Sequence, residues 1–306
     1  MKDTIRESLT QRSKSAKLET RGKIISLSFT AVIVILVISI IGFVAAKGSL
    51  IFIKDGVNPF DFLTHTTWKP NTLDANGHPI IGAAPMIVGS FVVTLFAAII
   101  ATPFAIAAAV YMTEISSKWG KKILQPVIEL LVGIPSVVYG FIGLTVVVPF
   151  VKDVAGGSGL GVLSGAFVLF VMILPTITSM TVDALKAVPR NYREASLALG
   201  ATRWQTTSKV VLRAATPGIL TAIIFGMSRA FGEALAVQMV IGNAMLMPTS
   251  LVSPSSTLTS VLTMNMGNSV QGSTSNNALW SLALILLLMS LIFNTVTRAI
   301  AKRGEF

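Results

Sequence analysis

The sequence contains no cysteine, only two histidines and few charged residues. The lack of cysteine excludes disulfides, thiolate metal sites and cysteine nucleophiles. His65 and His78 lie in one polar loop without the spacing of a metal site, so we expect no catalytic site, no metal and no cofactor. Charged residues make up 12% of the chain and hydrophobic residues 53%, whereas soluble domains carry about 25% charged residues. With a mean hydropathy of +0.76, this composition predicts an integral membrane protein.

Six uncharged or nearly uncharged runs are long enough to cross a bilayer as helices. At about 1.5 Å per residue, roughly 20 residues span a hydrocarbon core of about 30 Å. The runs cover residues 24–46, 86–112, 123–150, 160–181, 216–241 and 278–296. A β-barrel would instead show alternating segments of about ten residues. The sequence therefore predicts an all-α membrane protein with six transmembrane helices.

The lysines and arginines favour one side of this arrangement. They gather before the first run, between the second and third, between the fourth and fifth, and after the sixth. Five of the 24 Lys and Arg residues are exceptions. Arg229 lies within a run, and four lysines lie in the loops on the other side: Lys47, Lys54, Lys69 and Lys152. The positive-inside rule then predicts that both termini are cytoplasmic, which requires an even number of spans. The same rule accounts for the net charge of +11, so we expect no nucleic acid partner.

The runs divide the chain into four parts. Residues 1–22 are rich in Ser, Thr, Lys and Arg, which predicts a flexible cytoplasmic leader. Residues 23–85 hold the first transmembrane helix, whose apolar run is too long for a signal peptide, and an outer loop. Residues 86–300 form a core of five helices, and residues 301–306 form a cytoplasmic tail.

Two outer loops are expected to lie against the membrane or against the helices. The first, at 47–85, contains Trp68, which we expect to anchor this loop at the membrane interface. The second, at 242–277, is rich in Ser, Thr, Asn and Met but has no charged residue. A solvated loop usually carries charge, so we expect this one to pack against the outer mouth of the bundle or a docked partner.

Helix-breaking and polar residues are concentrated in the third run. They are Gly133, Pro135, Ser136, Tyr139 and Gly140. Proline removes a backbone donor and leaves a carbonyl that needs another partner, while glycine lets two helices approach closely. Two interpretations stay open for this segment: it packs closely against a neighbouring helix, or it lines a moving interface or pathway.

Three ionisable residues lie within the runs, where a charge costs at least about 2.5 kcal/mol on insertion scales. Glu129 is close enough to Lys122 in sequence to reach the cytoplasmic interface. Arg229 and Glu233 lie deeper and four residues apart, so the sequence predicts an ion pair on one helix face. This pair is either structural or part of a translocation pathway. In the second case Arg229 donates paired hydrogen bonds to an oxyanion such as phosphate or sulfate, and Glu233 holds Arg229 in position.

A polar segment between the fourth and fifth runs has the features of two short helices. Pro189 suits the first turn of a helix, Gly200 suits a left-handed stop, and Thr202 suits the N-cap of a second helix. We expect an L-shaped bracket at about 189–209 along the cytoplasmic surface, in a form suited to receiving force from a soluble partner. Its principal residues are Arg193, Glu194, Ala195, Ser196, Gly200, Ala201, Arg203 and Trp204.

The bracket also carries a family resemblance. Permease subunits of ABC importers share the pattern Glu-Ala-Ala, three residues, Gly, nine residues, Ile-x-Leu-Pro. The matching residues here are Glu194-Ala195-Ser196, Gly200 and Val210-Val211-Leu212, with Ser196 in place of the last alanine and Arg213 in place of the proline. Further strings are similar to the phosphate-specific branch, the PstC-type permeases: they lie at 62–68, 133–140, 192–206 and 229–233.

The resemblance covers nearly the whole chain from the first span on. It implies a type I ABC importer permease fold, in which the bracket is a cytoplasmic coupling helix seated in a cleft of a separate ATPase subunit. It also implies phosphate as substrate, a PstA-like second permease, two PstB-like ATPase subunits and an extracytoplasmic phosphate-binding protein. On this basis we expect a cell membrane permease subunit of an ATP-driven phosphate importer that hydrolyses no ATP itself.

Other functions stay open from the residues alone. A permease for sulfate or molybdate would keep the same fold and differ in its binding protein. A stand-alone anion channel or a secondary transporter would leave the bracket unexplained, whereas a role as a signalling scaffold is compatible with transport. An enzyme is least expected, because the glycine-rich stretch near Gly157 has no Gly-Lys-Ser/Thr after it and no nucleophile stands beside a base.

Overall fold

The computed structural model describes residues 14–74 and 77–303. In this part of the chain, six helices are long and apolar enough to cross a membrane, as the sequence predicts. They cover Leu18–Ile53, Ala84–Ile115, Ser136–Ala155, Val162–Ala187, Arg203–Phe231 and Thr274–Ile300. The chain divides into two compact units, Met1–Lys47 and Gly48–Phe306, which are described separately.

The first unit contains nearly all of helix α2 (Lys14–Gly48). This helix begins inside the segment 1–22 that the sequence predicts as a flexible leader, while residues 1–13 lie outside the described residues. Good helix formers extend it toward the N-terminus, and Lys23 Nζ lies 2.8 Å from Glu19 Oε1 across one turn. From residue 24 to 46 the helix is apolar on all sides, as a lipid environment requires.

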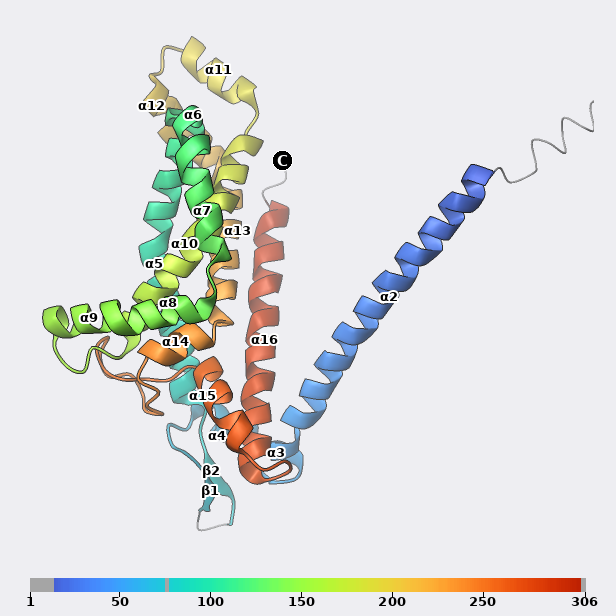
Figure 1. Cartoon of the computed structure of the whole chain (residues 1–306), viewed down its shortest axis with the longest axis vertical. Coiled ribbons are helices and arrows are strands. Elements are labelled where there is room, and N and C mark those ends of the chain that lie inside the picture. The colour runs from blue at the N-terminus through green and yellow to red at the C-terminus, as the bar shows by residue number, and fades with distance from the viewer. Residues whose placement is uncertain (1–13, 75–76, 304–306) are drawn as a thin grey trace, which may run out of the picture. The chain divides into compact units, whose positions relative to one another are not determined.

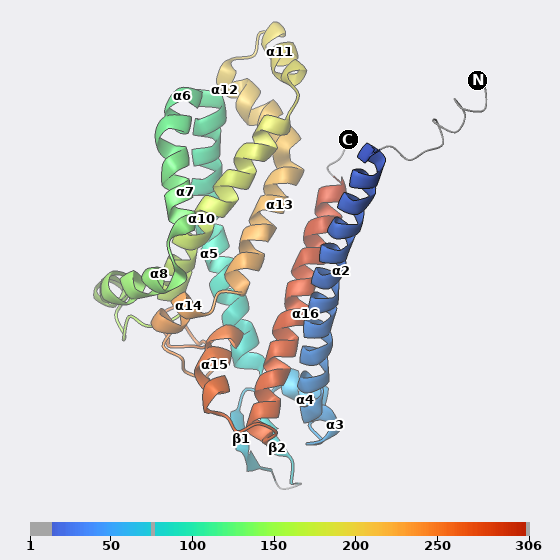
Figure 2. The same ribbon diagram turned by 45° about the vertical axis from the view of Figure 1, so that its right-hand side comes forward.

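The second unit consists of helices, one hairpin and their connections. In chain order its elements are α3 (Leu50–Ile53), α4 (Pro59–Thr64), β1 (Trp68–Leu73), β2 (Pro79–Ile81), α5 (Ala84–Val110), α6 (Ser117–Trp119), α7 (Gln125–Gly133), α8 (Ser136–Ile142), α9 (Val148–Ala155), α10 (Val162–Ala187), α11 (Arg190–Ala198), α12 (Arg203–Thr206), α13 (Leu212–Phe231), α14 (Leu235–Val240), α15 (Leu258–Asn265) and α16 (Thr274–Arg303). Wider π-helical turns and one 3₁₀ turn join some of them: η1 (Tyr111–Ile115), η2 (Gly120–Leu124), η3 (Gly143–Val147), η4 (Thr207–Val211) and η5 (Met266–Asn268). Helices α5, α10, α13 and α16 run along the same direction, with α11 and α12 at one end and the hairpin at the other (Figures 1 and 2).

Helices α5, α10 and α13 form the main core of this unit. Small residues bring them together: Ala97, Ala101 and Ala105 of α5 are fully buried. A Cβ atom on Gly226 of α13 would lie 2.6 Å from the Ile177 side chain of α10, so only glycine fits there. Close packing of small residues holds helices together where lipid removes the hydrophobic driving force. This packing fixes α13, and with it the end of the helix that bears Arg229.

The third and fifth apolar runs are not continuous helices, contrary to the prediction for 123–150 and 216–241. Helix α7 ends at Gly133, Ile134 is extended, and α8 starts at Ser136. Proline removes the amide hydrogen at position 135 and drives the preceding residue out of the helical region. From there α8, η3 and α9 cross the direction of α10 and α13 (Figures 1 and 2). The fifth run also breaks, without a proline, between the end of α13 at Phe231 and the start of α14 at Leu235.

The first outer loop folds into a cap on the helices, and the anchoring of Trp68 at the membrane interface stays a prediction. Strand β1 pairs antiparallel with β2, with Trp68 opposite Ile81. The Trp68 ring is half-buried, with its centroid 6.3 Å from that of Phe62, which is fully buried beside Met86. Apolar side chains that a surface loop would expose are thereby used to pack this loop onto α5, α15 and α16.

The second outer loop packs against the helices, and the prediction for 242–277 is confirmed. Ser255 and Ser256 are fully buried, and the amide of Leu258 donates to Ser90 Oγ of α5 at 2.9 Å. The amide of Leu163 at the start of α10 donates to the carbonyl of Leu251 at 2.8 Å. Backbone groups of this loop therefore find partners inside the protein, whereas the hydroxyls of Ser255 and Ser256 are buried without a hydrogen-bond partner among the described residues.

Candidate functional site

The break in the third run creates a polar contact in an apolar region. Because Pro135 has no amide hydrogen, the carbonyl of Leu131 four residues earlier lacks a helical donor. The hydroxyl of Tyr139 donates to this carbonyl oxygen at 2.7 Å, and the Tyr139 side chain is buried. One side chain of α8 therefore both satisfies the end of α7 and links the two helices across the bend.

The two glycines of this segment have different surroundings. A Cβ atom on Gly140 would lie 2.8 Å from Met239 Sδ and 2.9 Å from Ala236 Cα of α14, whereas one on Gly133 would have nothing within 4 Å. At the start of α8, Pro135 is exposed and Ser136 is half-buried. Of the two interpretations left open for this segment, close packing thus holds at Gly140, while Gly133 marks the bend.

Arg229 lies at the end of α13, and Glu233 lies beyond it. The predicted ion pair on one helix face is wrong, because α13 ends at Phe231 and the chain turns at Gly232 before α14. Among the residues that the structure describes, Nη1 of Arg229 donates instead to Thr176 Oγ1 of α10. The Arg229 side chain is exposed, and a guanidinium has five N–H donors, so this contact leaves donors for a ligand.

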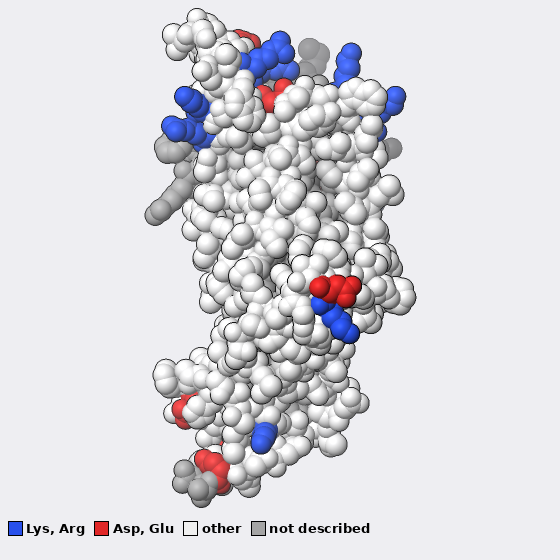
Figure 3. Space-filling view, turned by 90° about the vertical axis from the view of Figure 1, so that its left-hand side faces the viewer, with Lys and Arg blue, Asp and Glu red and all other residues white. Residues whose placement is uncertain are grey.

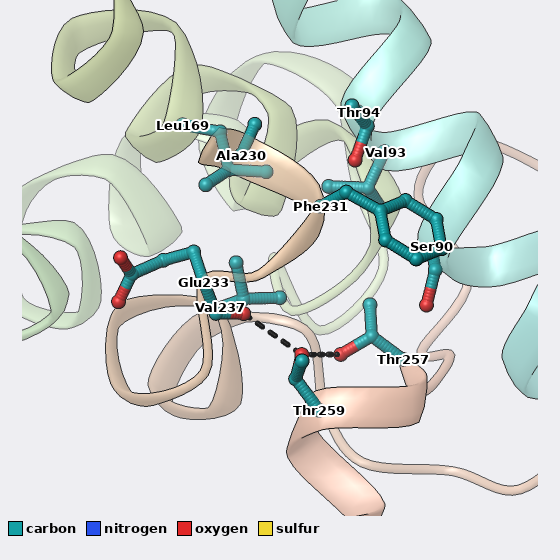
Figure 4. A pocket seen from close by; sticks show the side chains of 10 residues that line it. All are labelled: Ser90, Val93, Thr94, Leu169, Ala230, Phe231, Glu233, Val237, Thr257 and Thr259. Atoms are coloured by element: carbon teal, nitrogen blue, oxygen red, sulfur yellow. Dashed lines mark hydrogen bonds between the residues drawn. The ribbon is translucent and has the colours of Figure 1, made fainter. Parts of the chain in front are cut away.

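Glu233 lines a small cavity where the break after α13 meets α5, α10 and α15. Its volume of about 10 Å³ suits about one water molecule. The lining residues are Ser90, Val93, Thr94, Leu169, Ala230, Phe231, Glu233, Val237, Thr257 and Thr259. Figure 4 shows the backbone carbonyl of Glu233 accepting from Thr259 Oγ1, at 2.8 Å, while its carboxylate points away from the Thr257 and Thr259 hydroxyls. The second outer loop therefore holds the break in place through the backbone of Glu233 and leaves the carboxylate out of that contact.

The bracket forms as predicted in its first part and differs in its second. Gly200 adopts a left-handed conformation with φ of 82°, and Thr202 caps α12. Thr202 Oγ1 accepts from the amide of Gln205 at 3.3 Å, and Gln205 Oε1 accepts from the amide of Thr202 at 2.9 Å. Helix α12 then continues through η4 into α13, so the second arm is the start of the fifth transmembrane helix and no separate short helix. With Arg213 where the family pattern has proline, the backbone keeps the amide hydrogen that this continuation uses.

One polar contact joins the two arms of the bracket, and a second fastens the bracket to the rest of the unit. Ser196 Oγ and Thr206 Oγ1 lie 3.0 Å apart and join α11 to α12. The guanidinium of Arg193 forms a salt bridge to Glu114, at the end of η1, with an Nη2 to Oε1 distance of 2.7 Å. A cavity of about 580 Å³ lies beside this salt bridge. Its lining residues are Met112, Thr113, Glu114, Lys186, Val188, Arg190, Arg193 and Glu194.

The outer surface of the bracket is apolar at several points. Tyr192 and Trp204 are more than half exposed, and Leu199 at the corner is 90% exposed. Exposed large apolar side chains of this kind on a polar segment are typical of a surface that another protein covers.

The comparisons with known proteins agree with this geometry. Residues 101–305 match the family described as "Binding-protein-dependent transport system inner membrane component". The chain belongs to this permease family. A probable ABC transporter permease protein, YqgH of Bacillus subtilis (strain 168), is 51% identical over 288 residues, which are 94% of this chain and 92% of the relative. The phosphate transport system permease protein PstC of Pasteurella multocida (strain Pm70) is 33% identical over 266 residues, which are 80% of this chain and 81% of the relative.

Solved structures share the fold of this permease. A chain of the bacterial alginate ABC transporter aligns with a TM-score of 0.56 at 16% identity, covering 95% of this chain and 99% of that chain. A chain of the inward-facing MetNI methionine ABC transporter aligns with a TM-score of 0.51 at 22% identity, covering 69% and 91%. The protein is therefore a multi-pass membrane permease subunit of an ABC importer, and the family works with a separate ATPase and a substrate-binding protein.

The structure distributes the predicted bracket residues between the surface and the interior of the permease. Glu194, Ala195, Gly200, Arg203 and Trp204 are exposed. Ser196, Ala201 and Arg193 are half-buried, and Arg193 is bound within the chain. The exposed set is therefore available to a partner, whereas Arg193 and Ser196 hold the bracket together.

Three residues of these sites are missing from the sequence-based prediction. Glu114 follows the second apolar run by only a few residues, and its acidic character on the basic side of the chain is the one local signal for a partner. Thr176 lies within α10 and Thr259 near the start of α15. Nothing in the local sequence distinguishes either residue from the many other threonines of the chain. Their roles depend on contacts between segments far apart in the chain.

Proposed function

We propose that this permease subunit forms half of the pathway of an ATP-driven phosphate importer. The observation that carries the proposal is the exposed guanidinium of Arg229, at the end of α13 beside a helix break, in a chain similar to PstC permeases over four fifths of its length. A planar guanidinium binds the oxygens of a tetrahedral oxyanion through paired hydrogen bonds.

The helix break supports this role for Arg229. A break in a membrane helix frees backbone groups and is tolerated where it is buried in protein or lines a cavity. Arg229 precedes the break and Glu233 falls within it, so the same break contributes a guanidinium and a carboxylate to the proposed pathway. The negative charge of Glu233 opposes tight binding of an anion and thereby favours release, which transport requires.

Coupling to ATP hydrolysis is assigned to the bracket. The exposed residues of α11 and the corner at Leu199 would seat in an ATPase subunit, and α12 would pass the movement directly to α13 through η4. The complete complex would contain a PstA-like second permease, two PstB-like ATPase subunits and an extracytoplasmic phosphate-binding protein. ATP binding would draw the ATPase subunits together and switch the pathway from inward-facing to outward-facing.

Both termini of the permease are proposed to be cytoplasmic. The distribution of Lys and Arg supports this orientation, because basic residues cluster in the segments that hold α6, α11 and α12. On one face of the molecule these residues gather at the end that bears α6 and α11 (Figure 3).

The test is uptake of radiolabelled phosphate into vesicles that contain the complete complex with Arg229→Gln. We expect uptake to fall by at least about tenfold, since a hydrogen bond to a charged group contributes about 1.5–3 kcal/mol. Arg298→Gln removes an exposed arginine at the end of α16 and serves as the matched control, with normal uptake. Unchanged uptake and unchanged substrate-stimulated ATP hydrolysis in Arg229→Gln would refute the pathway role. If unlabelled sulfate or molybdate inhibited the uptake of labelled phosphate more strongly than unlabelled phosphate does, the substrate would be a different oxyanion.

A further inference from the structure

Arg193 closes the end of α10 at the point where α11 begins. Its Nη1 donates to the carbonyl of Val188 at 2.7 Å, and its Nη2 donates to the carbonyl of Leu185 at 2.9 Å. The last carbonyls of a helix have no intrahelical donor, and a positive charge there is favourable to the helix dipole. The Arg193 side chain of α11 thus provides donors for the last carbonyls of α10. These hydrogen bonds in turn fix the direction of the Arg193 side chain.

The same guanidinium holds the end of a second transmembrane helix. Nη2 and Nε of Arg193 lie 2.7 Å and 3.3 Å from the two carboxylate oxygens of Glu114, in the paired geometry that suits a guanidinium. Glu114 belongs to η1, which continues α5, and lies 79 residues from Arg193 in sequence. The side chains are only 13% and 22% exposed, so water screens this pair less than a surface pair.

Apolar packing does not supply this connection. All nine residues of α11 are described, and none of them is buried. The cavity of about 580 Å³ beside the salt bridge is lined by residues of α11, of η1 and of the end of α10. The orientation of α11 therefore depends on a few polar contacts, of which the one to Glu114 reaches α5.

We propose that Glu114 is a positioning residue, through which the Arg193 salt bridge transmits displacement of the bracket to α5 and α10. The inference rests on the proposed function, because it takes the bracket as the receiver of ATPase movement. Two connections then leave the bracket: one runs through α12 and η4 to α13, and the other through Arg193 to α10 and α5. The ends of α5, α10 and η4 also share a buried apolar cluster that includes Val110, Leu185 and Val211, so the Arg193 contact adds a direct connection from α11 to helices that already pack together.

The experiment uses the complete complex in proteoliposomes and measures phosphate transported per ATP hydrolysed. Glu114→Gln keeps the shape of the side chain and removes its charge. We expect the complex to assemble and ATP hydrolysis to continue, while the ratio of transport to hydrolysis falls at least about fivefold, the lower end of coupling between distant sites. Glu19→Gln is the control, because it breaks the exposed Lys23 pair within one helix and should leave the ratio unchanged.

A double-mutant cycle tests whether the pair acts as a unit. Arg193→Gln and Glu114→Gln should each lower the ratio, and the double variant should be no worse than Arg193→Gln alone, because both changes remove one interaction. Losses that multiply would overturn the proposal, as would a normal ratio in assembled Glu114→Gln. If Glu114→Gln fails to assemble, Glu114→Asp is measured instead, because a carboxylate that is one methylene shorter loses the paired geometry with Arg193. A lowered ratio of transport to hydrolysis in Glu114→Asp supports the positioning role, and a normal ratio excludes it.

The outcomes separate this inference from the proposed function. A wild-type complex that transports no phosphate with its partner subunits contradicts the proposed function itself. A wild-type complex that transports normally, with a Glu114→Gln variant that matches it, contradicts only the positioning role.

Discussion

Single polar side chains compensate for the helix breaks in this permease. The Tyr139 hydroxyl serves the Leu131 carbonyl that Pro135 leaves without a donor, and Thr259 serves the carbonyl of Glu233 after α13. A membrane interior offers no water to such groups, so each unpaired carbonyl would destabilise the fold. The bends that position the candidate pathway thus depend on individual hydroxyl groups.

Removing the Tyr139 hydroxyl tests this dependence. In Tyr139→Phe the ring still packs, but the Leu131 carbonyl loses its donor, which we expect to destabilise the permease by about 1–3 kcal/mol. The measurement is thermal unfolding of the purified complex, with Tyr111→Phe as the control, because the Tyr111 side chain is partly exposed. Equal unfolding temperatures for the two variants would contradict the role given to the hydroxyl.

At the scale of elements, hydropathy predicts how many helices cross the membrane but not where they bend. The run at 123–150 stays apolar through its break, and the one at 216–241 has one ionisable residue before its break and one within it, without a change in hydropathy that marks a bend. The spacing of Arg229 and Glu233 indicates a pair only if the helix continues, and Gly232 lies where it ends. Caps and stops are local, so Gly200 and Thr202 could be predicted. The contact between Arg193 and Glu114 joins segments that are far apart in the chain, so no local sequence pattern predicts that these two residues pair.

The bend between α7 and α8 supplies a prediction about packing, with a matched control in the same segment. In Gly140→Ala the new Cβ would lie 2.9 Å from Ala236 Cα, so backbone must shift, at a cost of about 1–3 kcal/mol. In Gly133→Ala the new Cβ meets open space, and the lower entropy of the unfolded chain makes the change neutral or slightly stabilising. Thermal unfolding should therefore show a lower unfolding temperature for Gly140→Ala, and an unchanged or slightly higher one for Gly133→Ala, than for the wild type. A Gly140→Ala protein as stable as the wild type would mean that α8 and α14 pack less closely.

At the scale of the whole molecule, many of the basic residues and the proposed coupling surface occupy the same end of the second unit. The end of α5, the bracket and the end of α16 all lie toward the end of this unit that is opposite the hairpin β1–β2 (Figures 1 and 2). Basic residues gather at this end (Figure 3). The charges from which the cytoplasmic orientation is predicted therefore surround the surface proposed for the ATPase.

The absence of cysteine makes this orientation directly testable, since single cysteines can be introduced without removing any native one. Leu73→Cys places a thiol on the exposed side of β1, and Lys118→Cys places one in exposed α6. In intact cells a maleimide that cannot cross membranes should label Leu73→Cys and leave Lys118→Cys unlabelled, and inside-out vesicles should give the reverse. Detergent, which opens both sides, should allow both to react and so controls for thiols that a partner covers. Labelling of Lys118→Cys in intact cells would place the bracket outside, where no ATPase could reach it, and would overturn orientation and coupling together.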